Sequence, residues 1–203
     1  MTPFLRPGRR SRAALLLALT SLPIATGCAT LQQLTALQHV DFALDRVTRV
    51  ELAGVDLFRI RGFEDLTISQ GMALAEAIRQ QQLDLDVGLA VRADNPASNV
   101  DARMVRLDWT LFLDDRETVS GRIDEEIVLP AGGTTPVPVS ARLDLIDFFD
   151  GGARELFEVA WALTGNAAEP ADVTLSLLPT IQTVLGPITY EAPIRVRLPG
   201  AGS

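Results

Sequence analysis

The sequence predicts a mainly β protein: a two-layer antiparallel β-sandwich of the immunoglobulin or fibronectin-III type, with two short amphipathic helices. Three observations support this. Several segments alternate between apolar and polar residues, as a half-buried strand requires, because successive side chains leave a pleated backbone on opposite sides. Short segments rich in Gly, Pro, Asn and Asp separate them. Only two segments show helical spacing, so neighbouring strands lack the intervening helices of a parallel sheet.

The clearest strand begins at Leu83, and every second residue from there to Val91 is apolar. Asp84, Asp86, Gly88, Ala90 and Arg92 lie between these apolar residues. Asn95-Pro96 ends the strand, because proline has no N–H to donate and asparagine favours turns. The sequence therefore predicts a strand with its apolar face on the core.

Upstream, apolar residues between about His39 and Arg61, interrupted at Gly54, predict an edge strand or a bulged strand pair. From Asp65 to Gln81 the spacing becomes helical. The apolar face of this helix comprises Gly71, Leu74, Ala75 and Ile78. We expect it to cover one open end of the sheets.

Downstream, a second half-buried strand is predicted with Val105, Leu107, Trp109, Leu111 and Leu113 on one face. Asp114-Asp115-Arg116 predicts a turn, and Thr118 to Leu129 a single further strand. After a loop at Pro130-Ala131-Gly132-Gly133, alternation from Val137 to Leu145 predicts another strand. Pro136 and Pro138 place it at a sheet edge, because proline cannot donate to the ladder.

A second helix follows Phe148-Phe149-Asp150-Gly151-Gly152 and is expected to end at Gly165. One face of it comprises Leu156, Val159, Ala160 and Leu163. Two closing strands are predicted, Ala171 to Val184 and Pro187 to Leu198. The residues of the last strand expected to face inward are Ile188, Tyr190, Ala192, Ile194, Val196 and Leu198.

Composition limits the class of protein. The hydrophobic content of 47% excludes an intrinsically disordered chain. All 18 basic residues are arginine; four lie in the first 27 residues, which hold no acid, so the 26 acidic residues give residues 28–203 a net charge of −12. Such a charge argues against a nucleic-acid partner, which needs a basic patch, and against electrostatic adhesion to anionic lipid.

Residues 1–27 have the pattern of a secretory signal peptide, with Arg6, Arg9, Arg10 and Arg12 before the apolar run Ala13 to Leu19. That run is too short to span a bilayer, which takes about 20 residues. Small residues then lead to Cys28, the one cysteine of the chain. A leftover thiol beside an ordinary cleavage site is the alternative interpretation of Cys28.

The segment Ala25-Thr26-Gly27-Cys28 resembles the lipobox of bacterial lipoproteins. This resemblance implies that signal cleavage leaves an acylated Cys28 as the N-terminus, anchoring the chain in the membrane. Ala29, by resemblance to the enterobacterial sorting rule, implies the outer membrane, facing the periplasm. The expected organisation is a signal peptide at 1–27, a tether at 28–38 and one domain at 39–199.

The order of elements also resembles a known family. It comprises the strand ending in Asn95-Pro96, then Leu107-x-Trp109-x-Leu111-x-Leu113, Gly121, Leu129-Pro130, Pro136-Val137-Pro138-Val139, a helix ending Leu163-x-Gly165, and a final strand. This resembles the type 2 late-embryogenesis-abundant family, also called the water-stress and hypersensitive-response domain, over roughly Val40 to Leu198. The resemblance implies a folded β-sandwich without catalytic residues, linked to desiccation and other stress, and often a lipoprotein in bacteria.

The sequence contains few residue patterns suited to catalytic chemistry. His39 is the one histidine, and no nucleophile elbow, phosphate-binding glycine loop or zinc ligand set accompanies it. Asp84, Asp86, Asp108 and Asp114 follow the polar phase of their strands, which indicates a solvated face. The acidic runs at 114–115 and 124–126 lack the calcium-loop pattern. The sequence therefore predicts no enzyme, no metal and no cofactor.

Five aromatic residues are candidates for ligand or partner contact: Phe112, Phe148, Phe149, Phe157 and Trp161. Phe112 points opposite to Trp109 and is expected to be exposed on the sheet. The other four either pack into the core, the favoured interpretation, or line an apolar pocket between the second helix and the sandwich.

These observations lead to a functional expectation: a non-enzymatic, lipid-anchored envelope protein that protects or scaffolds under desiccation or osmotic stress, in contact with lipid or envelope proteins. One alternative is a periplasmic binding module that carries an apolar ligand or lipid in the sandwich–helix pocket. Another is a hydrolase, which would need a cleft that gathers several carboxylates.

Overall fold

The computed structural model describes residues 39–149, 151–183 and 185–198. In chain order the elements are β1 (Asp41–Leu52), β2 (Val55–Asp56), η2 (Leu57–Arg59), η3 (Phe63–Asp65), α2 (Ile68–Arg79), β3 (Asp84–Asp94), β4 (Ala102–Leu113), β5 (Arg116–Ile123), β6 (Ile127–Leu129), β7 (Thr134–Asp144), α3 (Leu145–Phe148), α4 (Ala153–Ala162), β8 (Val173–Thr183), β9 (Gly186–Thr189) and β10 (Ile194–Arg197).

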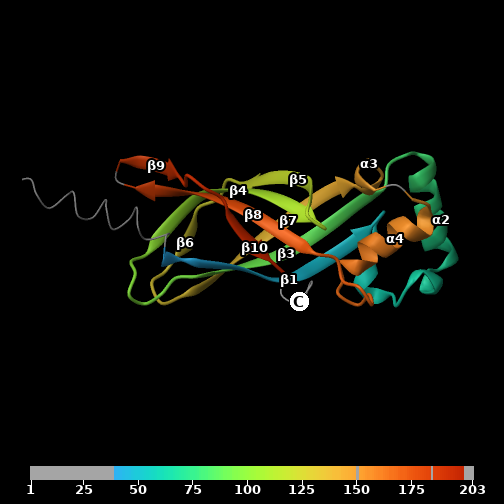
Figure 1. Cartoon of the computed structure of the whole chain (residues 1–203), viewed down its shortest axis with the longest axis horizontal. Helices are drawn as coiled ribbons and strands as arrows, with labels where there is room; N and C mark the ends of the chain where they lie inside the picture. Colours follow the sequence, from blue (N-terminus) through green and yellow to red (C-terminus); the bar gives the residue numbers. More distant parts are fainter. Residues whose placement is uncertain (1–38, 150, 184, 199–203) are drawn as a thin grey trace, which may run out of the picture.

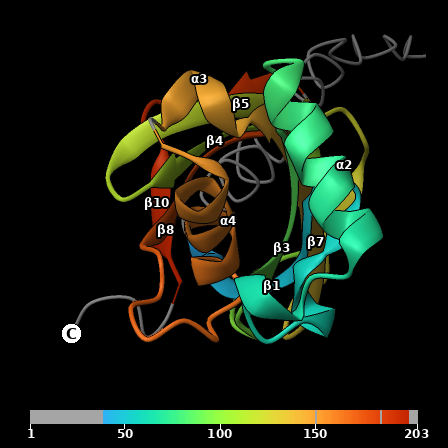
Figure 2. The same ribbon diagram turned by 90° about the vertical axis from the view of Figure 1, so that its right-hand side faces the viewer.

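The strands form two antiparallel sheets. One has the order β2-β1-β3-β7, and the other has the order β10-β8-β4-β5, with β6 paired to β4 and β9 to β8. The sheets face one another as two layers, and α2, α3 and α4 gather at one end (Figures 1 and 2). The predicted sandwich with two amphipathic helices is confirmed; α3 is an additional single turn.

The core lies between the two sheets and under the helices, and the strands that alternate in sequence supply most of it. The largest fully buried side chains are Phe157, Leu44, Leu52, Leu57, Leu83, Leu85, Leu89, Met104, Leu107, Leu111 and Leu113. Each contributes about 1.5–3 kcal/mol through removal of apolar surface from water. Most of these side chains come from strand faces that sequence alternation predicts, and Phe157 of α4, Leu57 of η2 and Met104 add to them.

β3 is central to its sheet, because it pairs with β1 on one side and β7 on the other. Its inward residues from Leu85 to Val91 are buried at every second position, as predicted, and Ala93 continues the pattern. β1 has two register shifts, between Leu44 and Arg46 and between Val47 and Arg49, and turns back into the short β2 at Ala53-Gly54. The expected bulged strand pair is confirmed.

Helix α2 begins with a capping box, in which Thr67 and Gln70 each accept the other's backbone N–H. Leu74 is its buried residue, and α2 lies across one end of the sandwich, as expected (Figure 2). The predicted face is shifted slightly, because Ala77 packs against the core whereas Ala75 is exposed.

The inward face of β4 changes phase at its start. A register shift between Met104 and Arg106 interrupts the pairing with β8, so Met104 is fully buried and Val105, which the alternation placed inward, is only half-buried. A bulge adds one residue on one side of a ladder and reverses the phase beyond it. The prediction for Val105 was wrong for this reason.

The segment predicted as one strand from Thr118 to Leu129 is two. β5 pairs with β4 along Leu107 to Leu113, and β6 pairs with its other end, from Ala102 to Met104. Asp124-Glu125-Glu126 separates them. All three acidic side chains are exposed, so the break between the two strands is solvated.

β5 joins β4 through a two-residue turn. Asp114 and Asp115 both have positive φ, 49° and 59°, as the tight hairpin turns that match strand twist require. The predicted turn is confirmed. β7 is an edge strand, which accommodates Pro136 and Pro138 as predicted.

Helix α4 buries Leu156, Phe157 and Ala160, and Gly165 follows it with a φ of 74°, as predicted for a C-terminal glycine. The closing segment from Pro187 to Leu198 is two strands rather than one. β9 pairs with one end of β8 and β10 with the other, and Pro193, which lacks an N–H, precedes β10. Ala192 is accordingly exposed, and Val196 is the one residue of the predicted set that is buried.

Asn95 forms a buried polar junction at the end of β3, with an exposed fraction of 2%. Its Nδ2 donates to the carbonyl oxygens of Val100 (3.0 Å) and Leu129 (2.8 Å), and its Oδ1 accepts from Asn99 Nδ2 (2.7 Å). Its backbone N–H donates to Gly133 O (2.9 Å). The side chain of Asn95 therefore joins the loop after β3 to strand β6, and its backbone N–H joins the loop before β7.

Candidate functional site

The outer face of the larger sheet carries an unusual concentration of hydroxyl groups. Alternation along β4 turns Trp109 inward and Asp108, Thr110 and Phe112 outward. The register then places Ser120 of β5 and Ser176 of β8 directly opposite Thr110, on either side of it. Three hydroxyls thus form one row across three strands, although they come from distant parts of the sequence.

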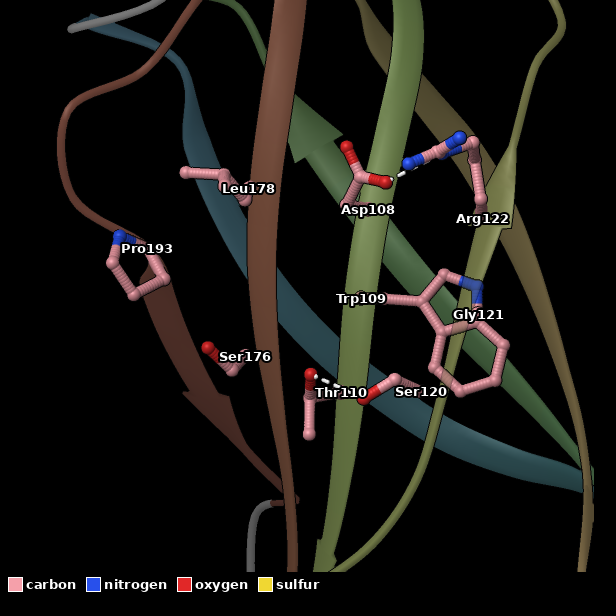
Figure 3. Close-up of a pocket in the computed structure, with 9 residues that line it drawn as sticks. All are labelled: Asp108, Trp109, Thr110, Ser120, Gly121, Arg122, Ser176, Leu178 and Pro193. Atoms are coloured by element: carbon pink, nitrogen blue, oxygen red, sulfur yellow. Dashed lines mark hydrogen bonds and ion pairs between the residues drawn. The ribbon is translucent and has the colours of Figure 1, made fainter.

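A first hollow of about 530 Å³ lies over this row. It is lined by Asp108, Trp109, Thr110, Ser120, Gly121, Arg122, Ser176, Leu178 and Pro193. Figure 3 shows the hydroxyls of Thr110 and Ser120 directed toward one another, 2.8 Å apart. Ser176 and Leu178 lie on β8, with Pro193 beyond them. The hollow therefore combines polar groups from three strands with an apolar margin.

Asp108 is the charged centre of the first hollow. Its Oδ1 accepts from Arg122 Nε at 2.6 Å, and its Oδ2 lies 3.3 Å from Arg106 Nε. The hydrogen bond that Arg122 donates to Asp108, together with the negative charge of this carboxylate, raises the pKa of Arg122 above its usual range. Arg122 therefore already has a charged partner within the hollow.

The floor beneath this hollow depends on a glycine. The indole of Trp109 lies against Gly121, its cross-strand neighbour, so closely that a Cβ at residue 121 would lie 2.3 Å from Trp109 Cζ2. Trp109 is 7% exposed. The sequence interpretation of Trp109 as a core residue agrees with this burial.

A second hollow, of about 460 Å³, adjoins the first along the strands and is lined by Phe112, Asp115, Thr174, Arg195, Val196 and Arg197. Its outward positions Phe112 and Thr174 are cross-strand neighbours, two residues along from Thr110 and Ser176. The guanidinium of Arg195 lies 5.4 Å from the centre of the Phe112 ring. Phe112 is half-buried on the outer face, the side expected from sequence.

Arg197 is paired within the second hollow. Its guanidinium lies 3.3 Å from Asp172 Oδ1 and 3.5 Å from Asp115 Oδ1, and its Nε donates to Thr174 Oγ1 at 3.3 Å. The two hollows together are lined by two carboxylates and three arginines, so their charge is nearly balanced.

The other aromatic candidates gather at the helical end. Phe157 is fully buried and meets Phe63 edge to face, with ring centres 5.4 Å apart. Phe63 is covered in turn by Arg154, whose guanidinium lies 4.6 Å from its ring centre and pairs with Glu64. Phe157 therefore contributes to the packing between helix and sandwich.

Phe148 and Phe149 are half-buried against the core, and Arg116 holds this segment. It donates to the carbonyl oxygen of Phe148 and lies 5.4 Å from the centre of the Phe149 ring. Trp161 is also half-buried, and its indole N–H is enclosed without a hydrogen-bond partner. This packing favours the core interpretation of these residues over an apolar pocket.

The remaining predictions concern single residues. Cys28 lies outside the described residues, and His39 is exposed before β1. Within residues 39–149, 151–183 and 185–198, no three His, Cys, Asp or Glu side chains are grouped to hold a metal ion. No helix in this part of the chain has the length and apolar character needed to cross a bilayer.

Sequence reasoning missed the paired hollows. The alternation predicts a solvated face for Asp108 and does not distinguish Thr110, Ser120 and Ser176 from other outward residues. Their outward phase was readable from the alternation, but the register that brings them together was not.

Comparison with known proteins gives a family and a set of weak structural likenesses. The family model described as "Late embryogenesis abundant protein" matches residues 90–202. The chain is similar to a crystal structure of a protein from Archaeoglobus fulgidus (13% identity, 56% of this chain and 83% of that chain, TM-score 0.32). It is also similar to a solution structure of an Arabidopsis thaliana protein (16% identity, 77% and 74%, TM-score 0.36). No curated protein matches the chain.

Proposed function

Since the chain belongs to the late embryogenesis abundant protein family, we propose that it is a non-enzymatic, lipid-anchored protein of the bacterial cell envelope that protects or scaffolds the membrane surface under desiccation or osmotic stress. Acylated Cys28 is its membrane contact, and the outer membrane, on the periplasmic side, is its location. Lipid or envelope proteins are its partners.

The observation that carries the protective role is the lateral pairing of charges on the outer faces of both sheets. Arg142 Nε donates to Asp86 across β3 and β7 at 2.7 Å, and Arg122 donates to Asp108 across β4 and β5 at 2.6 Å. Exposed pairs of this kind add little to stability in water. When water is scarce, however, each member of these pairs retains a charged partner within the protein, so this part of the folded surface stays satisfied as hydration is lost.

The anchor rests on the sequence pattern that ends at Cys28, and the fold is compatible with it. Thirteen residue steps separate Cys28 from Asp41, where β1 begins. A chain of that length reaches at most about 45 Å, so the sandwich would remain close to the bilayer. The helical end with α2 and α4 lies at the opposite end of the sandwich from the start of β1 (Figure 1).

The anchor is tested by expressing the full-length protein with a labelled fatty acid in a Gram-negative host. We expect label and membrane fractionation for the native sequence, and neither for Cys28→Ser. Ser21→Ala is the matched control, because it changes the same signal segment but keeps the lipobox. An unlabelled native protein, or label that survives Cys28→Ser, would refute the anchor.

The protective role needs a separate experiment. A strain lacking the gene should survive drying or osmotic shock less well, and the native gene should restore survival. Asp86→Asn with Asp108→Asn, expressed at the native level, should restore it less well. Equal survival of the deletion strain and the parent would refute protection while leaving the anchor untouched.

A further inference from the structure

We propose that the two adjoining hollows on the outer face of the larger sheet bind a short neutral oligosaccharide. The binding surface, called the hydroxyl trough here, comprises Thr110, Ser120, Ser176, Thr174, Phe112 and Arg195. The inference goes beyond the protective role and does not depend on the anchor, because it uses only side chains of the sheet.

The shape of the trough suits a short chain rather than a single small group. Its two hollows, about 530 and 460 Å³, each fall in the size range of small-molecule sites. They lie over successive outward rows of β4 and β8, Thr110 with Ser176 and Phe112 with Thr174. Such rows are roughly 7 Å apart along a strand, so the trough is elongated in the strand direction.

The hydrogen-bonding groups match a polyhydroxylated ligand. The Thr110–Ser120 hydrogen bond, 2.8 Å long, uses one of the two hydroxyl hydrogens, so the other hydrogen and several lone pairs remain for a ligand in the hollow that both residues line. Ser176 adds another donor and acceptor from β8. Sugar hydroxyls are themselves both donors and acceptors, so either orientation of each group can be satisfied.

The charges favour a neutral ligand over an anion. Arg122 is already paired with Asp108, and Arg197 with Asp115 and Asp172, while Arg195 lies over the Phe112 ring. An anion that approached Arg195 would meet the repulsion of Asp115, which lines the same hollow. A neutral sugar can bind without breaking these ion pairs, because its hydroxyl groups can donate hydrogen bonds to the carboxylates and accept hydrogen bonds from the guanidinium groups.

The trough also offers apolar surface for the C–H face of a sugar ring. Leu178 and Pro193 border the first hollow, and the half-buried ring of Phe112 lies on the outer face with the Arg195 guanidinium over one side of it. The hydroxyl groups of the trough can thus bind the hydroxyls at the edge of a pyranose ring, and the apolar side chains can pack against its C–H face. Since the hollows lie open on a sheet surface, we expect dissociation constants of about 0.1–10 mM.

The test is an NMR titration of the full-length, isotope-labelled protein in a detergent without a sugar headgroup. Trehalose, maltotriose and chitotriose are the neutral probes, and inorganic sulfate is the anionic one. We expect at least one neutral sugar to shift the amide signals of Thr110, Ser120 and Ser176, with an affinity independent of salt. Absence of such shifts up to about 10 mM for all three sugars, or shifts with sulfate alone, would overturn the proposal.

Variants separate this site from general effects. Ser176→Ala and Thr110→Val each remove one hydroxyl and should weaken binding about threefold to tenfold. Ser140→Ala is the matched control, because Ser140 is exposed on β7 of the other sheet, and it should bind as the native protein does. Amide spectra report whether each variant is folded. Two folded trough variants with native affinity, or equal weakening by Ser140→Ala, would contradict the assignment.

Discussion

Replacing Asn95 by alanine removes a side chain that joins three segments at the end of β3. The variant loses two hydrogen bonds donated by Nδ2, to Leu129 O at 2.8 Å and Val100 O at 3.0 Å, and one accepted from Asn99 at 2.7 Å. Because Asn95 is 2% exposed, water cannot readily replace these contacts. The free energy of unfolding should therefore fall.

The loss in the free energy of unfolding depends on how deeply each hydrogen-bond partner of Asn95 is buried. A buried group left without its partner costs about 1–3 kcal/mol, which applies to the bond to Leu129, whereas the half-buried contacts of Val100 and Asn99 cost less. The expected total is about 3 kcal/mol, and the melting temperature of a domain of this size should drop by about 6–12 °C. Few surface substitutions exceed about 0.5 kcal/mol.

Urea denaturation and thermal unfolding measure this loss. Asn166→Ala is the matched control, because Asn166 is exposed in the loop after α4, and its change should stay within about 0.5 kcal/mol. An Asn95→Ala protein as stable as Asn166→Ala would refute the structural role assigned to this junction.

Asn95→Asp sharpens the test, since it keeps the shape but replaces a donor by a carboxylate oxygen that faces two carbonyl oxygens. Burial should raise the pKa of this aspartate in the folded state above its unfolded value. The folded state then binds the proton more tightly, so the deficit relative to the native protein should shrink as pH falls through the raised pKa. A deficit independent of pH would contradict the geometry.

The remaining predictions concern two glycines and a tyrosine. Gly121→Ala places a Cβ 2.3 Å from Trp109 Cζ2 and should cost about 1–3 kcal/mol in urea denaturation, with a shift in indole fluorescence; native stability would argue against this contact. Gly71→Ala, the matched control in α2, meets nothing within 4 Å and should stabilise by about 0.5–1 kcal/mol, so a loss of stability there would show that the helix is packed differently. Burial raises the pKa of Tyr190 from 10.0 to about 12, and with one tyrosine and no lysine in the chain its phenolate absorbance can be titrated alone. Because the folded state holds the proton more tightly, this contribution to stability is present below pH 10 and is lost as pH rises through about 12; Tyr190→Phe should flatten that decline, and a midpoint near 10 in the folded protein would contradict the burial.

Local patterns were good predictors of which side chains are buried. The buried residues of β3 from Leu85 to Val91, the inward Leu107 and Leu111 of β4, and the edge position of β7 all follow from the sequence. Each depends on the two-residue period of a strand or on the missing N–H of proline, which are properties of a short segment.

The errors occur where distant segments meet. Val105 does not face inward, because a register shift between β4 and β8 changes the phase of β4 at this residue. The segment from Pro187 to Leu198 forms two strands, because β9 pairs with one end of β8 and β10 with the other. Asn95 was predicted to end a strand, but its buried contacts with Val100 and Leu129 could not be read from its neighbours in sequence. The acylation of Cys28 stays a prediction from sequence.

By itself, the sequence determined the mainly β class, the inward and outward faces of the strands and the resemblance that the family model bears out over residues 90–202. Only the tertiary structure decided which outward residues become neighbours, as when Ser120, Thr110 and Ser176 align across three strands and hollows open over them. The physical reason is that side-chain alternation follows from the geometry of one backbone segment. Register, by contrast, is set by pairing between segments far apart in the chain.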